Sequence, residues 1–209
     1  VNLYNEVCSG DKNFTEDAYV QAGEEIKAQA KKGFLNGCMT VDATTAEALF
    51  AAGKGAILIT GSWSIPTFTE DPERAKDFSY FPFPVVEGGK EDEAGYLYGG
   101  VANTLAISRS TKNKDAVVKF LKYMMSEEEQ TLSVERTGTF STVKVSPKEE
   151  NMDPLAYQFS QYVSDGVEGF IPYTDQALPP EQAENLLNAL TAIVAEDNAD
   201  VKAELAKIK

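Results

Sequence analysis

The order of apolar and polar residues predicts an amphipathic helix near the start of the chain, over residues 15–33. Its apolar face consists of Tyr19, Ala22, Ile26 and Ala30, which recur at helical spacing. Thr15 is the predicted N-cap, and Phe14 is placed to pack against Tyr19 across the first turn. Gly33 is expected to end this helix.

Similar signals predict several more helices. Thr44 and Glu47 have the spacing of a capping box, and their helix should end at Gly53. Ser126 and Glu129 form a second capping box. A short helix is expected to begin at Asp71-Pro72-Glu73, another to begin at Asn113, and a third to extend from Ser126 to near Gly138. Three more helices are expected over residues 154–163, 180–194 and 200–208. In the helix after Asn113, Ala116, Val117, Phe120, Leu121 and Met124 are expected to face inward.

Three short apolar segments, residues 56–60, 79–84 and 105–108, are predicted strands. Residues 56–60 are continuously apolar up to Thr60, as in a strand that is buried on both faces. Residues 79–84 contain two prolines, which suit an edge strand or a crossing segment. Residues 87–95 form a charged, glycine-containing loop. The alternation of helices and strands predicts an α/β fold.

The first predicted strand ends in Gly61-Ser62-Trp63, which contains the only tryptophan of the chain. An indole presented behind a glycine turn offers a flat apolar face, which favours ligand binding over bond-breaking chemistry. Backbone N–H groups of Gly61 and Ser62 could also donate to a ligand. A core position for Trp63 and a plain turn at Gly61 remain the structural alternatives.

Composition narrows the function classes further. The 209 residues carry a net charge of −14, which opposes binding to nucleic acid or to anionic lipid. There is no histidine, so a His-rich metal site is excluded, and we predict no metal and no cofactor. Cys8 and Cys38 either form one disulfide or are buried as small apolar side chains. No stretch approaches the roughly 20 apolar residues that span a bilayer.

Three segments resemble the family 1 extracellular solute-binding proteins of ABC transporters. They are FLNGCMTVDATTAEALFAAGKGAILITGSW, GGVANTLAISRSTKNKDAVVKFLKYMMSEEEQ and RTGTFSTVK, which occur in the family's order. In the third segment, Ser141-Thr142 replaces a proline that is common in the family. The resemblance implies the C-terminal lobe of a two-lobed, periplasmic-binding-protein-like (type II) fold, with a segment belonging to the N-terminal lobe. The start at Val1, without Met, favours a fragment.

The resemblance further implies a domain plan and a function. Residues 1–85 and 127–209 would form the C-terminal lobe, and residues 86–126 would cross to the missing N-terminal lobe. The full protein would capture a sugar or oligosaccharide by hinge closure and deliver it to an ABC permease. It would be extracytoplasmic, either lipid-anchored at the cell surface or periplasmic, and would not be an enzyme.

The resemblance also assigns candidate ligand-binding residues. It places Trp63 at the sugar-binding cleft and the pair Gly99 and Gly100 at the cleft floor, where backbone can approach a ligand closely. Tyr96, Tyr98 and Asn103 flank these glycines and could bind sugar hydroxyls. Tyr4, Asn5 and Phe140 are further candidates, although each type of residue is more often structural.

Two other functions remain open from the sequence. The acidic charge would suit the same fold binding a polyamine or a cationic peptide. A carbohydrate-cleaving enzyme needs only two carboxylates and no local motif. The sequence has no GxSxG elbow, Walker loop or GxGxxG motif, which argues against other enzyme classes.

Overall fold

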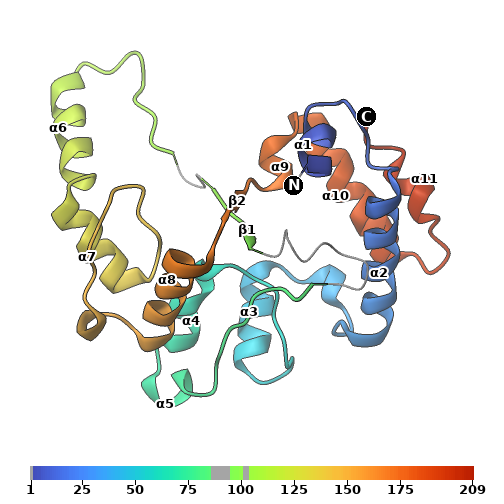
Figure 1. The fold of residues 1–209 in the computed structure, drawn as a ribbon, viewed down its shortest axis with the longest axis horizontal. Helices are drawn as coiled ribbons and strands as arrows, with labels where there is room; N and C mark the ends of the chain where they lie inside the picture. Colours follow the sequence, from blue (N-terminus) through green and yellow to red (C-terminus); the bar gives the residue numbers. More distant parts are fainter. Residues whose placement is uncertain (1, 86–94, 101–103) are drawn as a thin grey trace. The chain divides into compact units, whose positions relative to one another are not determined.

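The computed structural model describes residues 2–85, 95–100 and 104–209. These residues form two compact units, both visible in Figure 1. The first unit contains the described residues up to 46 together with residues 96–100 and 169–209. The second contains the described residues of 47–95 and 101–168.

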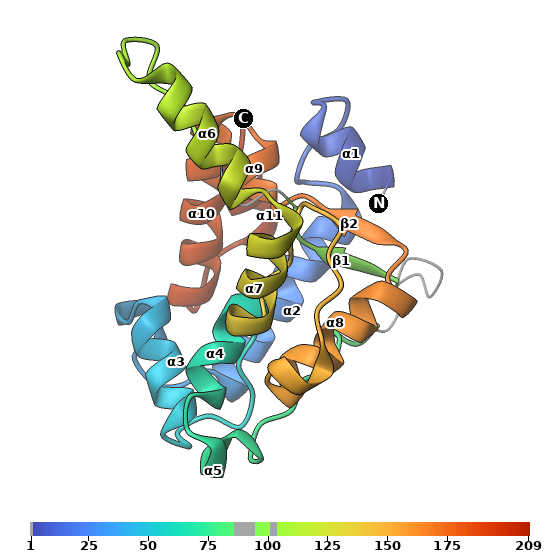
Figure 2. The ribbon, with the colours of Figure 1, turned by 90° about the vertical axis from the view of Figure 1, so that its left-hand side faces the viewer.

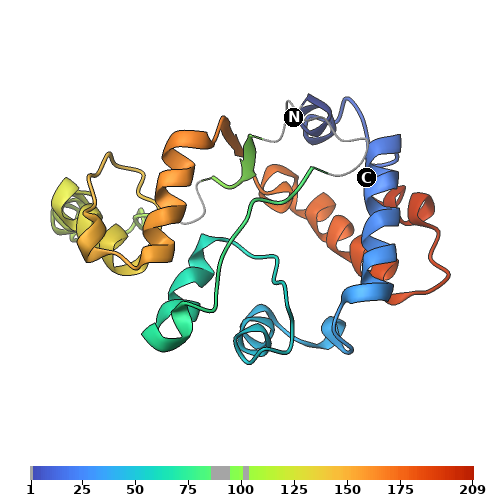
Figure 3. The ribbon, with the colours of Figure 1, turned by 60° about the horizontal axis from the view of Figure 1, so that its bottom comes forward.

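The first unit is a helical cluster built around one long helix from each end of the chain. Its helices are α1 (Asn2–Cys8), α2 (Asp17–Gly33), η1 (Cys38–Thr40), α9 (Thr174–Ala177), α10 (Pro180–Ala195) and α11 (Val201–Leu205). Helix α10 packs against α2, α9 and α11, and Figure 3 shows α2 crossing α10. Ile193 and Val201 are fully buried at the centre of this core. Gly23 lets α2 approach α11, because a Cβ there would lie 2.5 Å from Val201 Cγ1.

A two-stranded parallel sheet also belongs to the first unit. Strand β1 (Tyr96–Tyr98) pairs with β2 (Gly169–Ile171), and Leu97 lies opposite Phe170 (Figure 2). The pairing continues one residue further, where Gly99 N donates to Ile171 O at 2.9 Å. Neither strand is predicted from the sequence, since each has only three residues.

The second unit contains shorter helices around a separate core. They are α3 (Ala43–Ala51, whose first four residues belong to the first unit), η2 (Ser62–Ser64), α4 (Ile65–Thr69), α5 (Pro72–Ala75), α6 (Lys114–Met124), α7 (Glu127–Thr137), η4 (Glu149–Asn151) and α8 (Pro154–Gly166). The core joins α4, α7 and α8 through Ile65, Val134, Met152 and Ala156. Phe50, Phe68 and Phe78 form a neighbouring aromatic cluster.

Several predicted helix signals are confirmed. Ser126 Oγ accepts from Glu129 N, and α7 ends at Gly138, whose φ is +64°. Asp71 caps α5 by accepting from Glu73 N. Helices α8 and α10 begin at the predicted prolines, whereas α11 is shorter than expected. The predicted contact of Phe14 with Tyr19 is also present, at a ring-centroid distance of 5.0 Å.

Two predicted N-caps are wrong. Helix α2 begins after Glu16, and Thr15 instead donates to Asn13 Oδ1 through its N–H and its hydroxyl. Asp42 caps α3, because its carboxylate accepts from Thr45 N at 2.8 Å. Thr44 therefore does not form the expected capping box. In both places an Asx side chain accepts a backbone N–H from two or three residues further along the chain, but only Asp42 thereby caps a helix.

The three predicted strands are also wrong. Residues 56–60, 79–84 and 105–108 have no strand pairing within the described residues. Ile57 and Ile59 are 67% and 69% exposed instead of buried on both faces, and Phe81, Phe83 and Leu105 are also exposed. A strand is stable only when a neighbour takes up its backbone hydrogen bonds, and apolar composition alone does not supply that neighbour.

The inward face predicted for α6 is not buried. Asn113 occupies the N-cap position, as predicted, but its side chain makes no cap hydrogen bond. Phe120 is exposed and none of the α6 residues is fully buried, because α6 packs mainly against α7.

The remaining predictions have mixed outcomes. Cys8 and Cys38 are free and half-buried. Most of the predicted loop, residues 87–94, lies outside the described part of the chain. The proposed crossing of residues 86–126 to another lobe stays a prediction. No helix in the described ranges combines the length and the apolar character needed to cross a bilayer.

Candidate ligand-binding site

Trp63 lies on a tight turn at the start of α4 and is 56% exposed. Its indole packs closely over Gly61. A Cβ on Gly61 would lie 2.2 Å from Cζ3 and 2.5 Å from Cε3 and Cη2 of the ring. A larger residue here would therefore have to displace the ring, whereas the Gly61 backbone (φ −110°, ψ 177°) is an ordinary extended conformation.

The residue after Trp63 anchors the turn. Ser64 is only 1% exposed, and its hydroxyl donates to Glu47 Oε1 at 2.5 Å. Thr60 Oγ1 lies 2.7 Å from the same hydroxyl oxygen. Ser64 N donates to Gly61 O at 3.1 Å, which closes the turn itself. The indole is thus exposed, while hydrogen bonds fix Gly61 and Ser64 on either side of it.

A second group of candidate residues lies in the first unit, around Tyr98. The Tyr98 ring is 58% exposed and stacks on Tyr173, with centroids 6.5 Å apart and planes at 26°. Tyr4 approaches Tyr98 edge-on at 6.3 Å and donates its hydroxyl to Pro172 O at 2.5 Å. Tyr173 was not found from the sequence, where it follows Pro172 in a segment without a periodic pattern.

The glycine pair that follows β1 is positioned by the same strand pair. Phe170 lies over Gly99, because a Cβ on Gly99 would come within 2.8 Å of Phe170 Cδ1. At Gly100, no described atom lies within 4 Å of the corresponding position. Asn103 lies outside the described residues.

The other candidates occupy ordinary surface positions. Asn5 is exposed on α1, where its carbonyl accepts from Ser9 N. Phe140 is exposed and packs against Phe159 at 5.5 Å. The structure thus brings Gly61, Ser62 and Trp63 together in the second unit and Tyr98, Gly99 and Gly100 together in the first. Their role in ligand binding remains a prediction.

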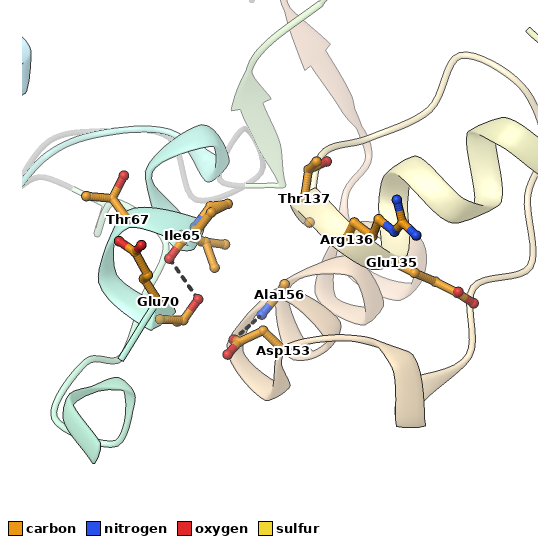
Figure 4. Close-up of a pocket in the computed structure, with 11 residues that line it drawn as sticks. Ile65, Thr67, Glu70, Glu135, Arg136, Thr137, Asp153 and Ala156 are labelled. Atoms are coloured by element: carbon orange, nitrogen blue, oxygen red, sulfur yellow. Dashed lines mark hydrogen bonds between the residues drawn. The ribbon is translucent and has the colours of Figure 1, made fainter. Parts of the chain in front are cut away.

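A pocket of about 500 Å³ lies elsewhere in the second unit and contains none of the predicted site residues. It is formed by α4, the end of α7 and the start of α8. Figure 4 shows Thr67 and Glu70 on the α4 side and Arg136 on the α7 side. Asp153 is already engaged, because its carboxylate accepts from the N–H groups of Leu155 and Ala156. The pocket therefore offers a polar surface formed by charged and hydroxyl side chains.

Two tyrosines near the candidate residues have raised pKa values. Burial, followed by the contact with Cys8, raises the pKa of Tyr4 well above its usual value. Burial also raises the pKa of Tyr19 to about 12. Both phenols are therefore neutral at physiological pH and act as hydrogen-bonding or packing groups. Within the described residues, no group of three or more Cys, Asp and Glu side chains is arranged to hold a metal ion.

Comparison with known proteins decides the family. The model of the bacterial extracellular solute-binding protein family matches residues 5–131, which is more than half of the chain. The chain belongs to the bacterial extracellular solute-binding protein family. This confirms the family expected from the three sequence segments. The maltotriose-binding protein of Pyrococcus abyssi is 32% identical over 132 residues, covering 59% of this chain and 27% of that protein.

Three solved structures resemble this solute-binding family member in fold. One, from work on xylan utilization by Caldanaerobius polysaccharolyticus, has a TM-score of 0.89 and 22% identity and covers all of this chain and 53% of its own. A chitin oligosaccharide binding protein has a TM-score of 0.83 and 25% identity over 98% of this chain and 50% of its own. A Streptococcus pneumoniae solute-binding protein, in complex with the blood group A-trisaccharide, has a TM-score of 0.69 and 21% identity. The match covers 92% of this chain and 48% of that protein.

These similarities confirm the fold class, an α/β portion of the periplasmic-binding-protein-like fold. The chain spans about half the length of these solved proteins and aligns with about a quarter of the maltotriose-binding protein. The family and its named relatives are binding proteins, which favours binding over catalysis.

Proposed function

We propose that this chain is the C-terminal portion of the substrate-binding subunit of an ABC importer. The full protein would capture a sugar or oligosaccharide between two lobes outside the cytoplasm and pass it to a membrane permease. The ligand would contact both lobes and shift the population toward the closed form. No catalysis is assigned to this subunit.

The exposed indole of Trp63 is the observation that carries this proposal. Gly61 and Ser64 hold the residue on a closed turn, yet more than half of its surface is exposed. A fixed indole suits the apolar C–H face of a pyranose, because an aromatic face provides apolar area with a defined geometry. The saccharides in the names of the relatives support the same ligand class.

The exposed apolar segments support the proposed domain plan. Within the described residues, nothing covers most of the surface of Ile57, Ile59, Phe81 and Phe83. An N-terminal lobe that takes up residues 86–126 would supply backbone partners and apolar cover for such segments. We therefore keep residues 1–85 and 127–209 as the proposed C-terminal lobe.

A thermal-shift screen tests the ligand class. The full-length protein that carries this chain is heated with mono- and oligosaccharides, polyamines or short cationic peptides. A ligand at 100 times its dissociation constant adds roughly 2.7 kcal/mol of stability, which is readily detected as a higher midpoint. We expect a saccharide to raise the midpoint, and Trp63→Ala to reduce that rise. Phe34→Ala is the matched control, because it removes an exposed aromatic ring outside the candidate site and outside the segments that the other lobe would cover.

Each alternative has its own outcome. A shift with a polyamine or peptide alone would keep the fold and replace the ligand class. Turnover of a chromogenic glycoside would make the protein an enzyme. A saccharide shift that survives Trp63→Ala unchanged would remove the indole from the site.

A further inference from the structure

The only buried polar residue in the described part of the chain is Ser64, directly after Trp63. A buried hydroxyl is retained only where its hydrogen bonds are satisfied. Here both partners precede Ser64 in the chain, one of them nearby and one on a separate helix. Glu47 lies 17 residues upstream on α3, and Thr60 lies four residues upstream, at the end of the apolar segment.

The direction of these hydrogen bonds follows from the chemistry of the groups. An ionised carboxylate only accepts, so the single proton of the Ser64 hydroxyl is directed to Glu47. The Ser64 oxygen can then only accept from Thr60, whose hydroxyl must donate. The relay therefore runs from Thr60 through Ser64 to Glu47, and the carboxylate is its terminal acceptor.

This relay encloses the three residues that present the indole. Thr60 precedes Gly61-Ser62-Trp63 and Ser64 follows them, so one hydroxyl pair joins both ends of the turn. Ser64 N donates to Gly61 O within the same turn, and Ile65 N donates to Ser62 O. Glu47 connects the closed turn to α3, which lies outside it. These hydrogen bonds fix the backbone at both ends of the segment that carries the indole.

We propose that Glu47 is a positioning residue for the indole of Trp63, acting through the buried hydroxyl of Ser64. The inference rests on the proposed function, because it deepens the role of the same turn. Glu47 does not contact the ligand. It sets the direction in which the indole faces. This positioning role takes the place of the helix-capping role that the sequence predicts for Glu47.

The fluorescence of the 209-residue chain tests the inference without any ligand, because Trp63 is its only tryptophan. Glu47→Ala and Ser64→Ala each remove the link. We expect both variants to lower the fluorescence anisotropy of Trp63 and to change its quenching by acrylamide. The size of each change should be similar in the two variants. Glu47→Gln keeps an acceptor oxygen and should restore the wild-type values. Thr44→Ala is the matched control on the same helix and should change neither value.

Combining the substitutions separates the relay from general destabilisation. Since both residues act through one hydrogen bond, the double variant Glu47→Ala/Ser64→Ala should change the anisotropy no more than either single variant. Circular dichroism defines the temperature at which every variant is folded. Should Glu47→Ala not fold, Ser64→Ala and Glu47→Gln decide the question.

Some results would overturn the inference. If the Glu47→Ala and Ser64→Ala variants fold and keep the wild-type anisotropy and quenching, Glu47 is a structural residue only. Another such result is a Gln variant that behaves like the Ala variant. In the full-length protein we expect Glu47→Ala to raise the saccharide dissociation constant roughly 2- to 12-fold, the range for losing one aromatic contact. If the wild type binds no saccharide, the proposed function fails, while the fluorescence result stands separately.

Discussion

Replacing Gly61 with alanine should turn the indole of Trp63 without unfolding the chain. The backbone of Gly61 (φ −110°, ψ 177°) is one that alanine adopts without strain. The added Cβ would nevertheless lie 2.2 Å from Cζ3 of the ring. Carbon atoms in contact are about 3.5 Å apart, so the ring edge must move by roughly 1.3 Å.

The cost of that movement in stability should be small. The indole is the outer end of a flexible side chain that is 56% exposed, so the ring edge has room to shift toward solvent. An off-rotamer side chain costs about 0.5–1.5 kcal/mol. Alanine in place of glycine lowers the entropy of the unfolded chain, which stabilises the native state by about 0.4–1 kcal/mol. We expect these effects to cancel within about 1 kcal/mol.

The cost in ligand binding should be larger than the cost in stability. An aromatic contact is worth about 0.5–1.5 kcal/mol beyond its buried area, so its loss weakens saccharide binding roughly 2- to 12-fold. The assays are urea unfolding and tryptophan fluorescence of the 209-residue chain, and saccharide titration of the full-length protein. Gly33→Ala is the control, because a Cβ there meets no described atom within 4 Å.

Two results would refute this reasoning. A Gly61→Ala chain with unchanged fluorescence and unchanged affinity would show that the ring does not need the space over Gly61. A loss of stability well above 2 kcal/mol would show that the ring cannot turn away, and hence that Trp63 serves as a core residue.

Three further predictions concern stability. Gly138→Ala should destabilise the chain by about 1–3 kcal/mol in urea, because φ is +64° and the new Cβ would lie 2.8 Å from Ala156 Cβ. The raised pKa of Tyr19 contributes stability that is present below about pH 10, its usual value, and is lost as the pH rises toward 12. Urea titrations across that range should therefore show a decline that Tyr19→Phe reduces. Asp42→Ala should lower the melting midpoint while Thr44→Ala leaves it unchanged, and equal effects would restore the predicted capping box.

The sequence by itself identified the family and most of the helices. Ser126, Asp71 and Gly138 mark helix ends correctly, because a cap forms within a few residues of itself and needs no distant partner. The two misplaced caps differ from the structure by one or two residues, because the N-cap of α2 is Glu16 and not Thr15, and Asp42 caps α3 in place of Thr44.

Strands and site geometry depended on tertiary structure. Residues 56–60 have the composition of a buried strand, yet no neighbour among the described residues takes up their hydrogen bonds. The actual strands, β1 and β2, lie more than 70 residues apart and have no alternating pattern that reveals them.

The same distinction holds for the candidate site. The sequence singled out Trp63, because a lone tryptophan behind a glycine is visible in one dimension. Only the fold shows that Glu47 reaches Ser64 across 17 residues and that Gly61 lies beneath the indole ring. Local patterns determine where helices begin and end, since their hydrogen bonds close within four residues. The partners of strands and buried side chains are decided only when the chain folds back on itself.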